Sequence, residues 1–169
     1  MTFISDSLNR IKPSATMVIT AKATQLKREG KKVIGLSSGE PDFDTPQHVK
    51  QAAIDAINSG YTKYTNIEGI PELRQSIVEK FKKDNDLNYD VSNVIVGTGG
   101  KQILFNALMS SLNKDDEVII PAPYWVSYPD MTLLAGGKPI FVDCSSETNF
   151  KLTGEALEKV ITQKSKWLI

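Results

Sequence analysis

Cysteine and histidine are almost absent from this 169-residue sequence, which contains one residue of each type, Cys144 and His48. A single cysteine excludes an internal disulfide framework, and one histidine with one cysteine cannot form a cluster of zinc-type ligands. We therefore expect no bound metal ion. Cys144 follows a short apolar run and is interpreted as an unreactive core or loop residue, whereas His48 falls in the first turn of an expected helix and should be exposed.

Charge of one sign is also lacking, because 20 Lys and Arg residues balance 20 Asp and Glu residues. A neutral chain offers no basic field to nucleic acid and no polybasic anchor to a membrane surface. No run approaches the roughly 18 apolar residues of a membrane span, and the start of the chain has no signal-peptide core. We expect a cytoplasmic protein that binds neither nucleic acid nor membranes.

Helical periodicity dominates the first part of the chain, where apolar residues recur every three or four positions. Ser14 can cap the first expected helix and Gly30 can end it. Thr45 is expected to cap a second helix with Pro46 at its first position, because proline suits the first helical turn. A third helix is expected after Pro71.

From residue 93 onward, short apolar runs alternate with helical segments, which is typical of a parallel sheet covered by helices. The sequence therefore predicts an α/β fold. The expected strands are residues 94–96, 118–120, 139–142 and 167–169, and the expected helices are residues 101–112, 126–135 and 152–161. The sequence stops within the last of these strands, so we expect it to be the front part of a longer protein.

Three glycines lie in the segment 97–102, between an expected strand and an expected helix. Ligands of such folds bind outside the carboxyl ends of strands, where the start of a helix offers free N–H groups to an anion. The segment is not a Walker loop, because Ile95 and Gln102 stand where that loop needs Gly and Ser or Thr. Gln102 also replaces the last glycine of a dinucleotide fingerprint. A phosphate site and a tight turn without a ligand both remain open on this motif alone.

Three aromatic residues follow the next expected strand, within residues 121–129. Trp125 could stack on a flat heteroaromatic ring, or it could pack in the core. An aromatic side chain beside a glycine-rich turn on the adjacent strand end indicates a phosphorylated aromatic cofactor.

Five short motifs occur in one order: SGEPDFDTP at 38–46, KY at 63–64, GIPELR at 69–74, GGKQ at 99–102 and PYWVSYP at 123–129. Together they resemble the front part of class I aminotransferases, the fold type I enzymes that depend on pyridoxal 5′-phosphate. The similarity is greatest to the bacterial aspartate aminotransferase subgroup, some of whose members act on prephenate. It implies that residues 1–45 form an N-terminal arm and small-domain segment, and that residues 46–169 begin the large cofactor-binding domain.

The resemblance also implies which residues bind the cofactor. Gly99, Gly100 and Lys101 match the turn that holds the cofactor phosphate in that family, and Trp125 matches the aromatic residue that stacks on the pyridine ring. Tyr64 matches a tyrosine that reaches the phosphate of the neighbouring subunit. A homodimer with shared active sites is therefore expected.

Substrate contacts are implied in the same way. Gly39 and Trp125 match positions beside the substrate, and Lys12 resembles a lysine that handles a second acidic group in the prephenate-active relatives. The lysine that forms the Schiff base lies beyond Ile169 in the family. We therefore expect no catalytic residue in this chain and no activity from it alone.

The expected reaction moves an amino group between an amino acid, aspartate or glutamate, and a 2-oxo acid such as 2-oxoglutarate, oxaloacetate or prephenate. An aromatic or alanine aminotransferase of the same class is the nearest alternative. A non-catalytic phosphate-binding α/β module is an alternative of a different class, against which Trp125 and the missing Walker Ser or Thr both count. A purely structural domain is a third.

Overall fold

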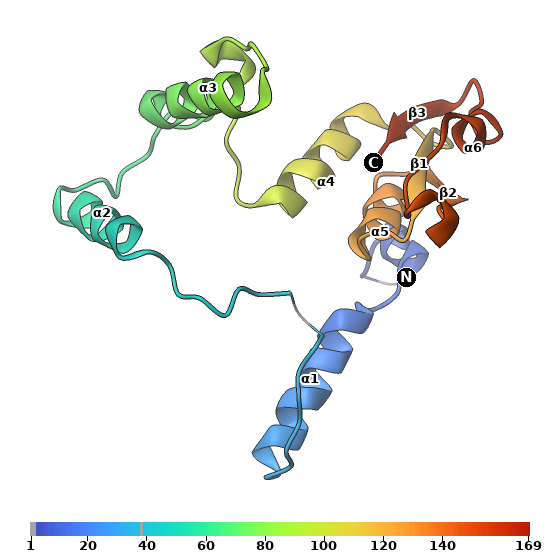
Figure 1. The fold of residues 1–169 in the computed structure, drawn as a ribbon, viewed down its shortest axis with the longest axis horizontal. Helices are drawn as coiled ribbons and strands as arrows, with labels where there is room; N and C mark the ends of the chain where they lie inside the picture. Colours follow the sequence, from blue (N-terminus) through green and yellow to red (C-terminus); the bar gives the residue numbers. More distant parts are fainter. Residues whose placement is uncertain (1–2, 38) are drawn as a thin grey trace. The chain divides into compact units, whose positions relative to one another are not determined.

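The computed structural model describes residues 3–37 and 39–169. Contacts along the chain divide these residues into two units. Figure 1 shows their helices and strands, coloured along the sequence. One unit combines the residues up to Pro13 with Thr98–Ile169, and the other is Ser14–Gly97. We call the first the sheet unit and the second the helical unit.

The helical unit contains the three expected helices, α1 (Ala15–Arg28), α2 (Gln47–Asn58) and α3 (Pro71–Asn85), and a short 3₁₀ turn. The predicted boundaries of α1 are confirmed. The Ser14 hydroxyl accepts the backbone N–H of Met17 at 3.4 Å, which satisfies one of the free donors of the first turn. Gly30 has φ +79°, the left-handed conformation that commonly ends a helix.

The cap predicted at Thr45 is wrong. Pro46 takes the N-cap position of α2, and no side chain caps this helix. The Asp44 carboxylate instead accepts the backbone N–H of Thr45 at 2.8 Å and pairs with Lys50. The backbone hydrogen bonds of α2 begin at the Pro46 carbonyl, which accepts the Val49 and Lys50 N–H groups, so the helix begins one residue later than predicted.

The strand predicted at residues 94–96 is also wrong. Val96 donates its backbone N–H to the Glu68 carbonyl at 2.9 Å, in the turn before α3, so this donor is not available to a strand ladder. The turn packs closely on Val96. Gly69 has φ +105°, and a Cβ atom there would lie 3.0 Å from Val96 Cγ2, so both backbone conformation and space require glycine.

The sheet unit confirms the predicted α/β class. Its three strands are β1 (Glu117–Ala122), β2 (Lys138–Asp143) and β3 (Ser165–Leu168), and the order β2-β1-β3 places β1 in the centre. Both pairings are parallel. Helices α4 (Gly100–Ser111) and α5 (Ser127–Leu134) lie before and after β1 in the chain, at the positions that the periodicity predicts.

The core of the sheet unit lies between β1, α4 and α5. Its buried side chains are Leu108, Leu112, Val118, Ile120 and Met131. Beside this core, the Trp167 indole N–H donates to the Ser111 hydroxyl at 2.8 Å, which joins β3 to α4.

The start of the chain also belongs to the sheet unit. A short 3₁₀ helix, η1 (Asp6–Arg10), packs on α5, and the Arg10 guanidinium donates to the Leu133 carbonyl at 3.3 Å. The positions of the two rare residues are as predicted, because Cys144 is buried and His48 is exposed.

Helix α6 (Gly154–Glu158) is shorter than the predicted helix over residues 152–161. The Thr153 hydroxyl caps its start by accepting the Ala156 N–H at 3.2 Å. Beyond it, the Thr162 N–H donates to the Ser165 hydroxyl at 2.9 Å. Lys159 and Ile161 still donate their N–H groups to the Glu155 and Leu157 carbonyls, so helix-type hydrogen bonds continue to the predicted end at residue 161 although the α-helix itself ends at Glu158.

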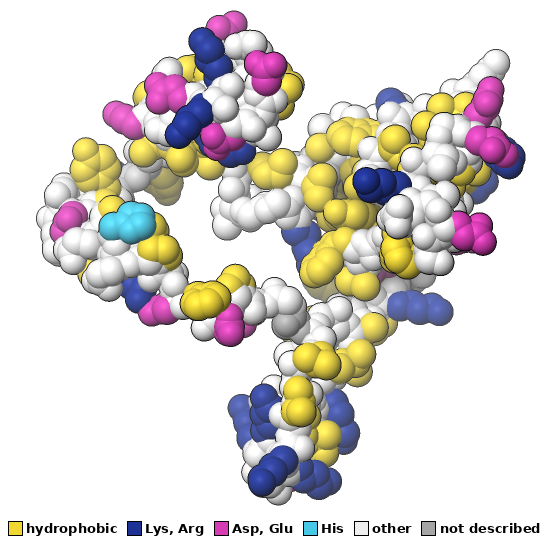
Figure 2. Space-filling view, in the orientation of Figure 1, with side chains coloured by type: hydrophobic (Ala, Val, Ile, Leu, Met, Phe, Trp, Pro, Cys, Tyr) yellow, Lys and Arg dark blue, Asp and Glu magenta, His cyan; other side chains and the backbone are white. Residues whose placement is uncertain are grey.

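Hydrophobic side chains remain at the surface in both units, and Figure 2 shows them in yellow among the charged residues. Among the described residues, no helix has the length and apolar character needed to cross a membrane.

Candidate functional site

A cavity of about 310 Å³ lies in the sheet unit, where the first turn of α4 faces residues at the start of α5. It follows the carboxyl end of β1, as ligand sites of open α/β sheets do. The lining residues are Gly100, Lys101, Leu104, Trp125, Tyr128 and Met131.

Residues 98–101, which we call the glycine turn, lead into α4, and two of them, Gly100 and Lys101, line the cavity. Gly99 is the N-cap with φ +82° and ψ 151°, a conformation that only glycine adopts readily. A Cβ atom at Gly99 or Gly100 would meet nothing within 4 Å, so the backbone here is open to an approaching group. The amides of the first helical turn lack acceptors within the helix and, with the helix dipole, favour an anion.

A side chain of α4 holds the first residue of the glycine turn. The Thr98 N–H donates to Gln102 Oε1 at 2.7 Å. Gly99 begins the backbone ladder of the helix, because its carbonyl accepts the Ile103 N–H at 3.3 Å.

Trp125 also lines the cavity, from the residues that precede α5. It is 55% exposed, so the alternative that it is a core residue is wrong for the described chain. Its carbonyl accepts the Tyr128 N–H at 3.1 Å, in the turn that leads into α5. An indole held next to a cavity can stack on a flat ring through its π face.

The cavity therefore combines three chemical features. Free amides at the N-terminus of α4, with the ammonium group of Lys101 beside them, suit a phosphate group. The indole of Trp125 suits an aromatic ring, and Leu104 and Met131 add apolar surface. A phosphorylated heteroaromatic cofactor fits this donor set and this aromatic surface.

The structure brings only some of the predicted site residues together. Gly100, Lys101 and Trp125 line one cavity, and Gly99 is their neighbour in the glycine turn. Lys12 belongs to the same unit and is exposed, but it does not line the cavity. The two remaining residues, Gly39 and Tyr64, lie in the helical unit, and both are exposed there.

Sequence reasoning did not identify four residues of this site: Leu104, Tyr128 and Met131 in the lining, and Gln102 as the partner of Thr98. Helical spacing could have found the lining residues. Leu104 lies four positions after Gly100 on α4, and Tyr128 and Met131 lie three positions apart on α5, so the members of each pair share one helix face.

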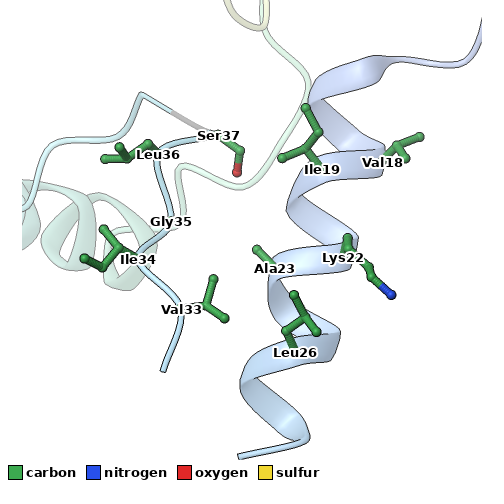
Figure 3. Close-up of a pocket in the computed structure, with 10 residues that line it drawn as sticks. All are labelled: Val18, Ile19, Lys22, Ala23, Leu26, Val33, Ile34, Gly35, Leu36 and Ser37. Atoms are coloured by element: carbon green, nitrogen blue, oxygen red, sulfur yellow. The ribbon is translucent and has the colours of Figure 1, made fainter. Parts of the chain in front are cut away.

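A wider cavity of about 610 Å³ lies in the helical unit, between α1 and residues 33–37. Figure 3 shows Ile19 and Ala23 on the side of α1 that faces this segment. The Thr20 and Ser37 hydroxyls, 2.9 Å apart, join the two segments. The lining is almost entirely apolar and offers no cluster of amides or cations to a phosphate, so we do not assign the chemistry to it.

Within the described residues, no group of three or more His, Cys, Asp or Glu side chains could hold a metal ion. The cavity at the glycine turn therefore remains the candidate site on the strength of its amides, its lysine and its indole.

Comparison with known proteins gives matches over the whole chain. Residues 31–169 match the family described as aminotransferase class I and II. The chain is 60% identical over 169 residues to a probable aspartate/prephenate aminotransferase of Rickettsia bellii and to an aspartate/prephenate aminotransferase of Cereibacter sphaeroides. It covers 42% of the length of each of these relatives.

Solved structures also resemble the chain over almost its whole length. The aspartate aminotransferase from Rhizobium meliloti matches with a TM-score of 0.93 and 50% identity, over 99% of this chain and 42% of that one. The aspartate aminotransferase of Thermus thermophilus with maleate matches with a TM-score of 0.95 and 45% identity, over 99% of this chain and 44% of that one. The chain thus spans less than half the length of the proteins that it matches.

Proposed function

Since the chain belongs to the aminotransferase class I and II family, we propose that it is the N-terminal portion of an enzyme that transfers an amino group from an amino acid to a 2-oxo acid. Pyridoxal 5′-phosphate is the proposed cofactor. The observation that carries the proposal is the cavity where Lys101 and the first turn of α4 face the indole of Trp125.

The proposed cofactor has a phosphate at one end and a pyridine ring at the other. Gly99, Gly100 and Lys101 would hold the phosphate through backbone amides and an ammonium group, and Trp125 would stack on the ring. When bound, the cofactor supplies an electron sink for the bond changes at the amino-bearing carbon. The residues of this chain would bind and orient that ring. Trp125 and the apolar side chains Leu104 and Met131 would exclude water from one side of it.

We propose aspartate or glutamate as the amino donor, and 2-oxoglutarate, oxaloacetate or prephenate as acceptors. Two relatives at 60% identity carry the name aspartate/prephenate aminotransferase, which supports this choice. The Thermus thermophilus structure contains maleate, a four-carbon dicarboxylate of aspartate size. Gly39 is proposed to lie beside the substrate carboxylate, and Lys12 is proposed to meet a second acidic group.

The proposal extends to the assembly of the whole protein. Residues 1–45 are proposed to belong to an N-terminal arm and small domain, and residues 46–169 to the large cofactor domain. The enzyme is proposed to be a homodimer in which Tyr64 of one subunit reaches the phosphate in the other. The near absence of cysteine is consistent with the proposed cytoplasmic location.

The test uses the full-length protein of which this chain forms part. Purified protein is titrated with pyridoxal 5′-phosphate, and cofactor absorbance and amino transfer from aspartate to 2-oxoglutarate are measured. We expect bound cofactor and turnover. A protein that binds inorganic phosphate but neither binds the cofactor nor transfers amino groups would favour the phosphate-binding module instead.

A further inference from the structure

We propose that Gln102 is a positioning residue that preorganises the glycine turn for a phosphate group. This rests on the proposed function, because it assigns a role within the same cavity. From the sequence alone, Gln102 only argues against two known loops. It stands where a Walker loop needs Ser or Thr and where a dinucleotide fingerprint needs Gly.

Gln102 lies in the first turn of α4. With Gly99 as the N-cap, Gln102 is the third residue of the helix. A glutamine at this place commonly turns back to bond to the N-cap amide in a capping box. Here Gln102 reaches one residue further and accepts the Thr98 N–H at 2.7 Å. The bond therefore spans the whole glycine turn and ties its first residue to the helix.

The glycine turn has much conformational freedom, because two of its residues are adjacent glycines. Gly99 and Gly100 are adjacent, and neither has a neighbour within 4 Å of the place where a Cβ would stand. Such a segment has many accessible backbone conformations, and ordering it costs free energy when a ligand binds. A bond that fixes Thr98 reduces this cost beforehand, so binding becomes tighter without a new contact to the ligand.

The Gln102 bond acts on the glycine turn and not on the hydrophobic core of the unit. Gln102 is exposed, and its bond joins two residues of one local segment. It buries no apolar surface, and the core residues of α4 lie further along the helix, at Leu108 and Leu112. Loss of the bond should therefore change the turn and leave the packed unit intact.

The experiment compares Gln102→Met with the parent in the full-length protein. Methionine keeps the length of the side chain and removes the amide oxygen. We expect faster hydrogen–deuterium exchange at the Thr98 amide in the cofactor-free protein. We also expect the dissociation constant for pyridoxal 5′-phosphate to rise about three- to tenfold, as loss of one hydrogen bond does. The dissociation constant for pyridoxal, which lacks the phosphate, should not change.

The matched control is Gln75→Met on α3, where the exposed Gln75 amide donates to Glu79 at 2.9 Å. This variant should leave Thr98 exchange and both dissociation constants at the parent values. Gln102→Glu keeps an acceptor oxygen, so Thr98 exchange should stay close to that of the parent.

Three results would overturn the inference: unchanged Thr98 exchange in Gln102→Met, accelerated exchange in Gln102→Glu, or equal weakening of pyridoxal and pyridoxal 5′-phosphate. The last result is what a merely structural role predicts. A parent protein that binds no cofactor contradicts the proposed function itself. The exchange measurement needs no cofactor, so it separates that failure from a failure of the role of Gln102.

Discussion

At the scale of single residues, Trp125 has the combination expected of a ligand contact. More than half of its surface is exposed, and it lines the same cavity as Lys101. Its neighbour Tyr124 has a different role, because its ring stacks on Phe141 with the centroids 5.1 Å apart. Trp125 thus lines the cavity, whereas the adjacent Tyr124 packs against β2.

Replacing Trp125 with Ala in the full-length protein should weaken binding of pyridoxal 5′-phosphate. An aromatic contact contributes about 0.5–1.5 kcal/mol beyond its buried area, so the dissociation constant should rise at least about two- to tenfold. Fluorescence or absorbance titration of the cofactor-free protein measures it. Trp125→Phe keeps a ring and should lose less. Equal affinities for the parent and Trp125→Ala would rule out stacking.

Some residue-level features of the fold and the site can be predicted from the sequence, and others cannot. The Ser14 cap, the Gly30 stop and the glycine turn follow from local patterns. The cavity also brings Gly100, Lys101 and Trp125 together, as we expected of a glycine-rich turn beside an aromatic residue. The bond from Thr98 to Gln102 could not be deduced, because an exposed glutamine on a helix satisfies the same pattern whether or not it turns back to the chain.

At the scale of elements, the tight packing just before β2 depends on a buried glycine, Gly137, which lies against Leu112, Asp116 and the α5 residue Thr132. A Cβ atom at Gly137 would lie 2.9 Å from Leu112 Cδ1 and 3.1 Å from the Asp116 carbonyl. The backbone carbonyl cannot rotate away, and the leucine belongs to the core. The sequence pair Gly136-Gly137 predicts a turn but gives no measure of this packing.

Gly137→Ala should therefore destabilise the full-length protein by about 1–3 kcal/mol, the usual cost of overpacking a core. Gly154→Ala is the matched control, because a Cβ there meets nothing within 4 Å and alanine suits the first turn of α6. Urea unfolding measures both. A Gly137→Ala midpoint equal to that of Gly154→Ala would contradict the packing argument.

A carboxylate at the start of β1 links this strand to its neighbour β3. Asp116 accepts the Asn113 N–H at 2.7 Å and the Lys166 ammonium at 2.9 Å. The backbone hydrogen bond from Asn113, then the one from Lys166, lower the pKa of Asp116 below its ordinary value near 4. A lowered pKa stabilises the fold above the unfolded pKa, and this contribution is lost as pH falls through the folded pKa.

Asp116→Asn should consequently lower the urea midpoint of the full-length protein at pH 7. The difference from the parent should shrink below pH 4, as the parent carboxylate becomes protonated. Unfolding curves at pH 3, 5 and 7 measure the trend. A difference that grows toward low pH would have the wrong sign for this ion pair.

One failed prediction at the element scale has an identifiable cause. Residues 94–96 have strand composition, yet no strand forms there. The Val96 N–H donates instead to the Glu68 carbonyl, in the turn before α3. Local periodicity carries no information about which competing acceptor lies within reach.

At the scale of the whole molecule, the proposed dimer can be tested through Tyr64, because this residue is proposed to act on the cofactor of the other subunit. Tyr64→Phe removes a hydroxyl proposed to bond to the phosphate in the other subunit, which should cost about 1.5–3 kcal/mol of cofactor binding. Lys101→Met should weaken cofactor binding by removing the ammonium group that is proposed to contact the phosphate. This ammonium group comes from the same subunit as the Trp125 that is proposed to stack on the ring.

Hybrid dimers of one Tyr64→Phe subunit and one Lys101→Met subunit distinguish the two arrangements. If Tyr64 acts across the interface, one site in each hybrid has both residues intact and the other has neither. Cofactor titration should then show half of the sites at the affinity of the parent. Two weakened sites, with none at the affinity of the parent, would place Tyr64 in its own subunit.

The bond between Arg10 and Leu133 has a consequence for synthesis on the ribosome. Its donor and acceptor lie 123 residues apart, and the helical unit is made in the interval between them. At translation rates of about 5–20 residues per second, Arg10 waits for roughly 6–25 s before α5 has been synthesised. Arg10 therefore has no such acceptor while the helical unit is made, and η1 can pack on α5 only afterwards.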